Sequence, residues 1–214
     1  GIDTLVGTAD NDTFIASSDG AATSTSNLGD SINGGLGIDT VKIYSNAATT
    51  VIPNLTNVEN LWIQDTVHES VNASTITGLT SLTQTGGTTI AAGTITNTVA
   101  AGQTLNFANI LDGDSVNDGA TQGEIVIASA ASVASVAVTL NAVGAQTGLS
   151  ASNDVDFNVS GTGVKTVDIT STGVNNISLA NTGGAITTLN IMGAGSTTIQ
   201  GNTPTTLTTF DASK

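Results

Sequence analysis

Residues 34–42 read Gly-Gly-Leu-Gly-Ile-Asp-Thr-Val-Lys and match the template G-G-x-G-x-D-x-U-x, in which U is a large apolar residue, at every specified position. Glycines at the first, second and fourth places let the backbone turn its carbonyl oxygens inward, because there is no Cβ to clash. Asp39 adds a carboxylate. Hard oxygen ligands suit Ca²⁺, which takes about six to eight of them. The stretch therefore predicts a calcium-binding turn followed by a short strand, with Val41 pointing into a narrow core.

The acidic position of this nine-residue register recurs three times before the 34–42 match. It is occupied by Asp3, Asp12, Asp30 and Asp39. One match arises easily by chance in a Gly-rich chain, but four acidic positions in one register favour calcium turns. The alternative is plain Asx and glycine turns without metal. The candidate ligands in these turns are Asp3, Gly7, Ala9, Asp10, Asn11, Asp12, Asp30, Gly35, Gly37 and Asp39.

Residues 16–28 interrupt the repeats with small polar side chains and are expected to form a loop insert. The alternative is a degenerate repeat, in which Ala21 would occupy the acidic position and Thr23 the apolar strand position. Neither residue suits its place. The insert is therefore the stronger interpretation.

The insert decides which aspartates share an ion. Successive turns of a β-roll alternate sides, so a calcium ion is shared by turns two repeats apart. With an insert, Asp12 pairs with Asp39 and Asp3 with Asp30; without it, Asp12 and Asp30 fall on one edge. We expect one ion between the turns that contain Asp12 and Asp39, with peptide carbonyls supplying the remaining ligands.

The charge balance excludes several classes of partner. The chain has 17 acidic residues, 3 lysines and no arginine, for a formal net charge of -14. It offers no phosphate-binding face, so we expect neither nucleic acid nor an anionic membrane surface as a partner, and no membrane insertion. The absence of cysteine excludes disulfides, thiolate metal sites and a cysteine nucleophile. A secreted protein of this kind can be stabilised by metal instead.

The composition predicts an all-β fold with a thin core. Ala, Val, Ile and Leu are interleaved with Thr, Ser, Asn and Gly, a mixture typical of short strands and tight turns. Aromatic residues make up only 3% of the chain. Tyr44 and Trp62 are expected to pack within the fold, with a sugar-binding platform as the alternative. From Val51 onward no helical period survives.

Short apolar triplets recur along the second half at intervals of about eight to twelve residues. They are Val155-Asp-Phe157, Val167-Asp-Ile169, Ile177-Ser-Leu179, Leu189-Asn-Ile191 and Thr197-Thr-Ile199. The spacing predicts a right-handed parallel β-solenoid with one strand per face, and a β-sandwich is the alternative for the C-terminal part. Within 128–149 a short helix is conceivable, but alternating apolar residues favour a strand. We expect calcium β-roll turns over 1–44 and a continuing solenoid over 45–214.

A second acidic cluster gives a weaker indication of metal binding. Asp112, Asp114 and Asp118 cluster within seven residues, but Val116 and a late Glu124 do not fit an EF-hand. The cluster predicts either a calcium loop of another kind or a polar turn.

The sequence favours no catalytic site. The carboxylate pairs Asp112/Asp114 and Asp154/Asp156 are expected to be surface loops or calcium ligands rather than glycosidase residues. His68 lacks the second histidine of a zinc protease motif, and no serine lies in a nucleophile-elbow pattern. We therefore do not expect an enzyme.

The nonapeptides resemble the RTX (repeats-in-toxin) family, and the order of features over the first 63 residues is similar to RTX-type surface-layer (S-layer) proteins of the Caulobacter kind. The resemblance implies type I secretion from a Gram-negative bacterium and a calcium-dependent lattice on the cell surface. The chain looks like a fragment of a larger protein. The family's lipopolysaccharide-anchoring region and secretion signal are not visible, so any contact with cell-surface polysaccharide is expected through regions absent here.

Three functions are consistent with these features. The favoured one is a structural subunit that assembles with copies of itself into a two-dimensional surface layer. The second is an RTX adhesin module that binds glycans or cells, and the third is the non-catalytic β-roll of a secreted hydrolase. An ice-binding solenoid would need a regular Thr-x-Thr ladder, and no fixed period carries one along the chain.

Overall fold

The computed structural model describes residues 1–19, 23–46, 49–65, 69–87, 94–111, 125–144, 154–184, 186–200 and 203–213. Their strands are β1 (Thr4–Val6), β2 (Thr13–Ser18), β3 (Ser31–Asn33), β4 (Thr40–Ser45), β5 (Asn54–Thr56), β6 (Asn60–Gln64), β7 (Ser81–Thr85), β8 (Ile95–Val99), β9 (Thr104–Ala108), β10 (Ile125–Ser129), β11 (Ser135–Asn141), β12 (Val155–Val159), β13 (Thr166–Thr172), β14 (Val174–Ala180), β15 (Thr188–Met192), β16 (Ser196–Gln200) and β17 (Thr209–Asp211). The one helix among these residues is the 3-10 turn η1 (Ala73–Thr75). No helix of the described segments is long and apolar enough to cross a membrane.

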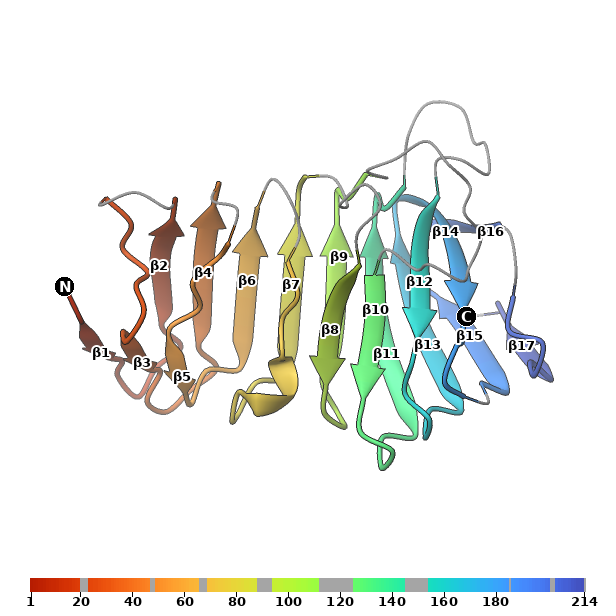
Figure 1. The fold of residues 1–214 in the computed structure, drawn as a ribbon, viewed down its shortest axis with the longest axis horizontal. Helices are drawn as coiled ribbons and strands as arrows, with labels where there is room; N and C mark the ends of the chain where they lie inside the picture. Colours follow the sequence, from red (N-terminus) through yellow and green to blue (C-terminus); the bar gives the residue numbers. More distant parts are fainter. Residues whose placement is uncertain are drawn as a thin grey trace.

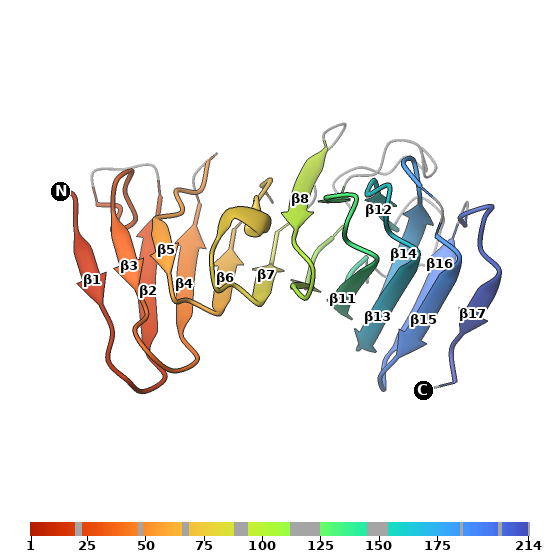
Figure 2. The ribbon, with the colours of Figure 1, turned by 90° about the horizontal axis from the view of Figure 1, so that it is seen from below.

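The strands stack into an elongated parallel β-solenoid (Figure 1). One wall is a nine-stranded sheet in the order β17-β15-β13-β11-β9-β7-β6-β4-β2. The facing wall consists of a three-stranded sheet, β1-β3-β5, and a five-stranded sheet, β16-β14-β12-β10-β8. Figure 2 shows the two smaller sheets following one another along the length of the molecule. Each turn of the solenoid therefore contributes one strand to each wall over most of its length.

The core follows from the alternation of apolar and polar residues along each strand. In β4 the buried side chains alternate with partly exposed ones, and Val41 and Ile43 point inward. The parallel register stacks Val41 on Leu61 of the next rung, where a rung is one turn of the solenoid. The column of inward-pointing side chains continues in the following rung. The stacked side chains are mostly Val, Ile and Leu, as the composition predicts. Phe107 and Phe157 are the large exceptions, with ring centroids 5.3 Å apart in an edge-to-face contact.

The strand predictions for the second half are confirmed. Each apolar triplet lies in a strand, from β12 to β16, and β11 occupies the alternating segment within 128–149. Where these strands are described they pair in parallel, for example β11 with β13 and β12 with β14. A β-sandwich is built from antiparallel strands, so the solenoid alternative is the one that the structure adopts.

Two predicted boundaries differ from the structure. β2 extends to Ser18, so the loop predicted at 16–28 begins only after this residue. The first three residues of that segment continue the strand because their backbone pairs with β4. The boundary predicted between 44 and 45 falls within β4, which pairs with both β2 and β6. The N-terminal rungs and the rest of the solenoid therefore share one sheet.

Tyr44 and Trp62 pack against each other on the outer face of the nine-stranded sheet rather than in the core. Their neighbours Val41, Ile43, Leu61 and Ile63 fill the inward positions of the same strands. Because successive side chains of a strand point to opposite faces, Lys42, Tyr44 and Trp62 face outward.

Candidate metal centre

The 7–12 and 34–39 turns stack directly on one another at the start of β2 and β4. Thr13 pairs with Thr40 in the sheet. Between the turns, the backbone N–H of Leu36 donates to the carbonyl of Thr8 at 3.0 Å, and Thr40 donates to Asp12 at 2.9 Å. This is the pairing that the loop insert predicts, and it differs from the alternative in which Asp12 and Asp30 share an edge.

Glycines make the close stacking possible. A Cβ at Gly7 would lie 2.0 Å from the carbonyl oxygen of Gly34, and a Cβ at Gly34 would lie 1.9 Å from that of Asn57. Gly35 and Gly37 adopt φ angles of 101° and 118°, which L side chains rarely adopt. The first glycine therefore allows contact with the next rung, and the later ones shape the turn.

Asp39 connects the two turns through its carboxylate. Its Oδ1 accepts a 2.7 Å hydrogen bond from the backbone N–H of Asp12. The side chain is only 1% exposed, and among the described residues its Oδ2 has no hydrogen-bond partner. A buried carboxylate oxygen without a partner is costly unless a cation or donor offsets its charge. Of the carboxylate oxygens in these two turns, Oδ2 of Asp39 is therefore the one whose surroundings fit a cation best.

Asp12 is half-buried and folds back on its own turn. Its Oδ2 accepts hydrogen bonds from the backbone N–H of Thr8 at 2.6 Å and from the Thr8 hydroxyl at 3.0 Å. A Cβ at Gly7 would lie 2.7 Å from Asp12 Oδ2, and one at Gly34 would lie 2.4 Å from Asp39 Oδ2. The two carboxylates thus occupy equivalent positions in successive turns. Together with the carbonyl oxygens of both turns, they form a donor set of the hard-oxygen type that Ca²⁺ prefers.

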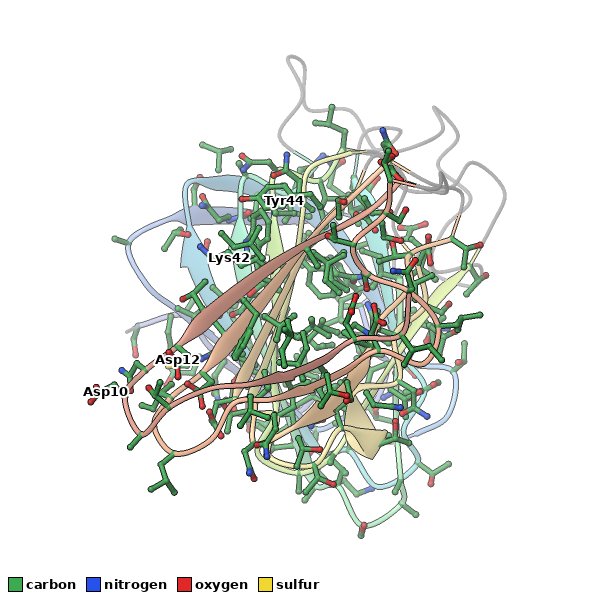
Figure 3. The ribbon with its side chains drawn as sticks, turned by 90° about the vertical axis from the view of Figure 1, so that its left-hand side faces the viewer. Asp10, Asp12, Lys42 and Tyr44 are labelled. Carbon is green, nitrogen blue, oxygen red and sulfur yellow. The ribbon has the colours of Figure 1, made fainter. Side chains whose placement is uncertain are left out.

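The other predicted residues of these turns are nearer the surface. Asp10 lies at the exposed tip of the first turn, where its backbone N–H donates to Thr8 (Figure 3). Asn11 is exposed, and its side-chain oxygen accepts a 2.9 Å hydrogen bond from Ile38 of the second turn. Ala9, directly before Asp10, is also exposed. Only peptide oxygens are available as ligands from Ala9.

The second predicted pair, Asp3 and Asp30, is also brought together, on the opposite wall at the start of β1 and β3. Asp30 Oδ1 accepts a 2.8 Å hydrogen bond from Asp3 N–H, and Oδ2 accepts a 2.7 Å bond from Asn27 N–H. These two donors hold the pKa of Asp30 below its ordinary value, with Asp3 contributing most. Both oxygens of Asp30 already accept hydrogen bonds from backbone N–H groups. The Asp30 carboxylate is therefore better explained as a cap on these donors than as a metal ligand.

Glu59 extends the Asp12–Asp39 column and was not predicted as a site residue. Its Oε2 accepts a 2.7 Å hydrogen bond from the backbone N–H of Asp39, in the position that Asp39 takes toward Asp12. The rung that separates these residues is 20 residues long instead of 27, so the nine-residue register does not reach Glu59. The available signal was that Glu59 directly precedes an apolar strand, as Asp39 does.

The remaining predicted ligands lie outside the described residues. These are Asp112, Asp114 and Asp118. His68 also lies outside the described residues. Within the described segments, no group of three or more His, Asp or Glu side chains converges as a metal site. A cation held by the paired turns would therefore depend on two carboxylates and on peptide carbonyls.

Comparison with known proteins finds no matching family model, no matching curated protein and no matching solved structure.

Proposed function

We propose that this chain is a calcium-stabilised structural subunit of a secreted bacterial surface layer, which assembles with copies of itself. The observation that supports calcium most directly is the buried Oδ2 of Asp39, which has no hydrogen-bond partner among the described residues and lies in a turn stacked on that of Asp12. The resemblance of the nonapeptides to RTX surface-layer proteins supports the lattice.

Asp12 and Asp39 would hold the ion with carbonyl oxygens of the 7–12 and 34–39 turns. The bound ion would supply positive charge against two carboxylates that otherwise repel each other. The chain's own contribution is the stacking: Asp39 accepts a hydrogen bond from Asp12, and Glu59 accepts one from Asp39. Calcium would thus stabilise the first rungs rather than take part in a reaction.

Self-assembly is supported by apolar side chains on the surface of the same turns. Leu36 and Ile38, in the 34–39 turn, are 72% and 59% exposed, and Ile15 on the outer face of β2 is 68% exposed. Exposed apolar residues that cluster on neighbouring rungs are typical of interaction surfaces. Because two of them belong to a proposed calcium turn, ordering of that turn would couple calcium to association.

The two parts of the proposal are tested together by sedimentation velocity and thermal unfolding, each in excess calcium and in excess chelator. We expect calcium to raise the unfolding temperature and to promote association that chelator reverses. An identical unfolding temperature in both buffers would contradict the metal site. A chain that is stabilised by calcium but stays monomeric at high concentration would contradict self-assembly alone.

Leu36→Ser is the matched variant for the assembly step. It removes an exposed apolar side chain without touching a carboxylate, so calcium should still stabilise the monomer while association weakens. If association is unchanged in this variant and in Ile38→Ser, the surface of the 34–39 turn is not the interface.

A further inference from the structure

The only tyrosine and the only tryptophan of the chain lie in contact on the outer face of the nine-stranded sheet. The rings of Tyr44 and Trp62 have centroids 5.2 Å apart and an interplanar angle of 63°. Lys42 Nζ lies 5.8 Å from the centroid of the Trp62 ring. The edge-to-face contact restrains the tyrosine ring, yet Tyr44 remains 44% exposed. The chain thus holds an aromatic ring on its surface in a defined orientation.

A hollow of about 420 Å³ lies beside Tyr44, toward the carboxyl ends of β2, β4, β6 and β7. This volume falls within the range of roughly 300–1,000 Å³ that is typical of small-molecule sites. The other described residues lining it are polar or glycine: Ser17, Asp19, Ser45, Asn46, Gln64, Asp65, Gly86 and Gly87. The site is therefore a polar hollow with one aromatic wall.

Several of the lining groups are fixed in place by the fold. The Ser45 hydroxyl donates a 2.9 Å hydrogen bond to the carbonyl of Ser18. Asp19 accepts a 3.1 Å hydrogen bond from the hydroxyl of Thr23. Asp65 is only 3% exposed. The hollow is thus formed in advance by the ends of stacked strands, which lowers the entropic cost of binding.

The chemistry of the lining matches a sugar ring. A pyranose has an apolar C–H face, which packs against aromatic rings, and a rim of hydroxyl groups. The Tyr44 ring can pack against the apolar C–H face. The amides of Gln64 and Asn46 can both donate and accept, and carboxylates accept from hydroxyls.

The charge of the lining selects among sugars. Among the described residues of the lining, Asp19 and Asp65 are acidic and none is Lys, Arg or His. Lys42 lies over the Trp62 ring and is not among the lining residues. Like charges repel, so a uronic acid, a sialic acid or a sugar phosphate is disfavoured, and a neutral sugar is accepted.

We propose that this hollow binds a neutral sugar residue of an oligosaccharide, with the C–H face of the sugar against Tyr44. The inference goes beyond the calcium-dependent structural role. The hollow lies at the end of β2 and β4 opposite to the turns of Asp12 and Asp39, and Figure 3 shows Asp12 apart from Tyr44. Either proposal can therefore fail without the other.

The test is a titration of the calcium-loaded chain with tetrasaccharides of glucose, mannose, N-acetylglucosamine and galacturonic acid. Trp62 is the only tryptophan and touches Tyr44, so its fluorescence reports on this site, and calorimetry measures the affinity independently. We expect at least one neutral tetrasaccharide to bind saturably and to change the emission. The galacturonic acid tetramer should bind at least about tenfold more weakly.

Three variants establish the place of binding. Tyr44→Ala should weaken binding at least about tenfold, because it removes the aromatic wall, and Tyr44→Phe should retain affinity within about threefold because it keeps the ring. Phe210→Ala, which removes an exposed aromatic residue on β17, is the control and should bind like the parent chain. Circular dichroism checks that each variant is folded. The proposal is overturned if no neutral tetrasaccharide binds, if Tyr44→Ala binds as well as the parent, or if the galacturonic acid tetramer binds best.

Discussion

The backbone N–H of Asp12 donates a 2.7 Å hydrogen bond to Oδ1 of Asp39, 27 residues later in the chain. The second oxygen of the same carboxylate is buried and has no hydrogen-bond partner in the described part of the chain. One side chain therefore joins two rungs and also presents a negative charge that nothing described neutralises.

Asp39→Asn should have opposite effects in calcium and in chelator. The amide keeps an oxygen that can accept from Asp12 N–H, but it is a weaker calcium ligand. In excess calcium the variant should lose the stabilisation by the ion, which amounts to about 2.7 kcal/mol at a calcium concentration of 100 Kd. In chelator it should be as stable as the parent or more so, because a buried charge has been removed. Chemical unfolding in both buffers measures the difference.

Asp30→Asn is the matched control for that experiment. Both oxygens of Asp30 accept hydrogen bonds from backbone N–H groups, so the substitution should destabilise the chain to a similar extent in calcium and in chelator. If Asp39→Asn behaves in the same way as Asp30→Asn, Asp39 serves only as a structural cap.

Gly34→Ala should destabilise the chain strongly, because its Cβ would lie 1.9 Å from the carbonyl oxygen of Asn57. Backbone atoms must move to relieve this contact, and we expect a cost of roughly 3 kcal/mol. Gly102→Ala provides the comparison: it has a φ of 83° but no heavy atom within 4 Å of its Cβ, so only conformational strain of about 1 kcal/mol applies. Urea unfolding of both variants measures the two costs. Equal losses would show that the rungs do not need the close stacking at Gly34.

Acid should remove a contribution of Asp30 to stability. Hydrogen bonds from Asp3 and Asn27 lower the pKa of Asp30 in the folded chain, so the folded state holds its proton more weakly than the unfolded state does. Its contribution is complete above the ordinary pKa of an aspartate and is lost as the pH falls through the lower folded pKa. Asp30→Asn should therefore flatten the acid limb of the stability curve, measured by urea unfolding at pH values from about 6 down to about 2. An unchanged acid limb would argue against this linkage.

Glu69 should make the free energy of unfolding depend on pH in the direction opposite to that of Asp30. Burial raises its pKa, although the N–H of Thr50 donates to its carboxylate and partly offsets the effect. The folded state therefore binds the proton more tightly than the unfolded state does, so the free energy of unfolding rises as the pH falls through the raised folded pKa, and the gain is complete below the ordinary pKa of a glutamate. Glu69→Gln should stabilise the chain at neutral pH, and the gain should disappear in acid. A gain that is the same at every pH would contradict this interpretation.

Phe107→Ala should open a cavity in the core between the two walls. Phe107 is 1% exposed and packs edge-to-face on Phe157, so we expect a loss of about 3–5 kcal/mol. Phe210→Ala, at a side chain that is 57% exposed, should change the free energy of unfolding by less than about 0.5 kcal/mol. Calorimetric unfolding compares the two. Similar losses would mean that the Phe107–Phe157 contact does not stabilise the core.

The sequence by itself determined the parallel strands and the pairing of Asp12 with Asp39. Both follow from local rules: apolar residues alternate with the period of a strand, and a fixed nine-residue register carries the aspartates from turn to turn. The alternation also places Tyr44 on the face opposite to Val41 and Ile43. Its outward orientation could have been predicted from that pattern alone.

Only the tertiary structure decided which residues of successive rungs meet where the rung length changes. Rungs differ in length, with bonded residues 27 apart between Asp12 and Asp39 and 20 apart between Asp39 and Glu59. A change of rung length leaves the apolar pattern of each strand intact but shifts what lies beside it, so neither the position of Glu59 nor the contact of Tyr44 with Trp62 follows from spacing. The unpartnered oxygen of Asp39 likewise depends on the rungs above and below, because burial and hydrogen bonding are properties of the stacked solenoid and not of one turn.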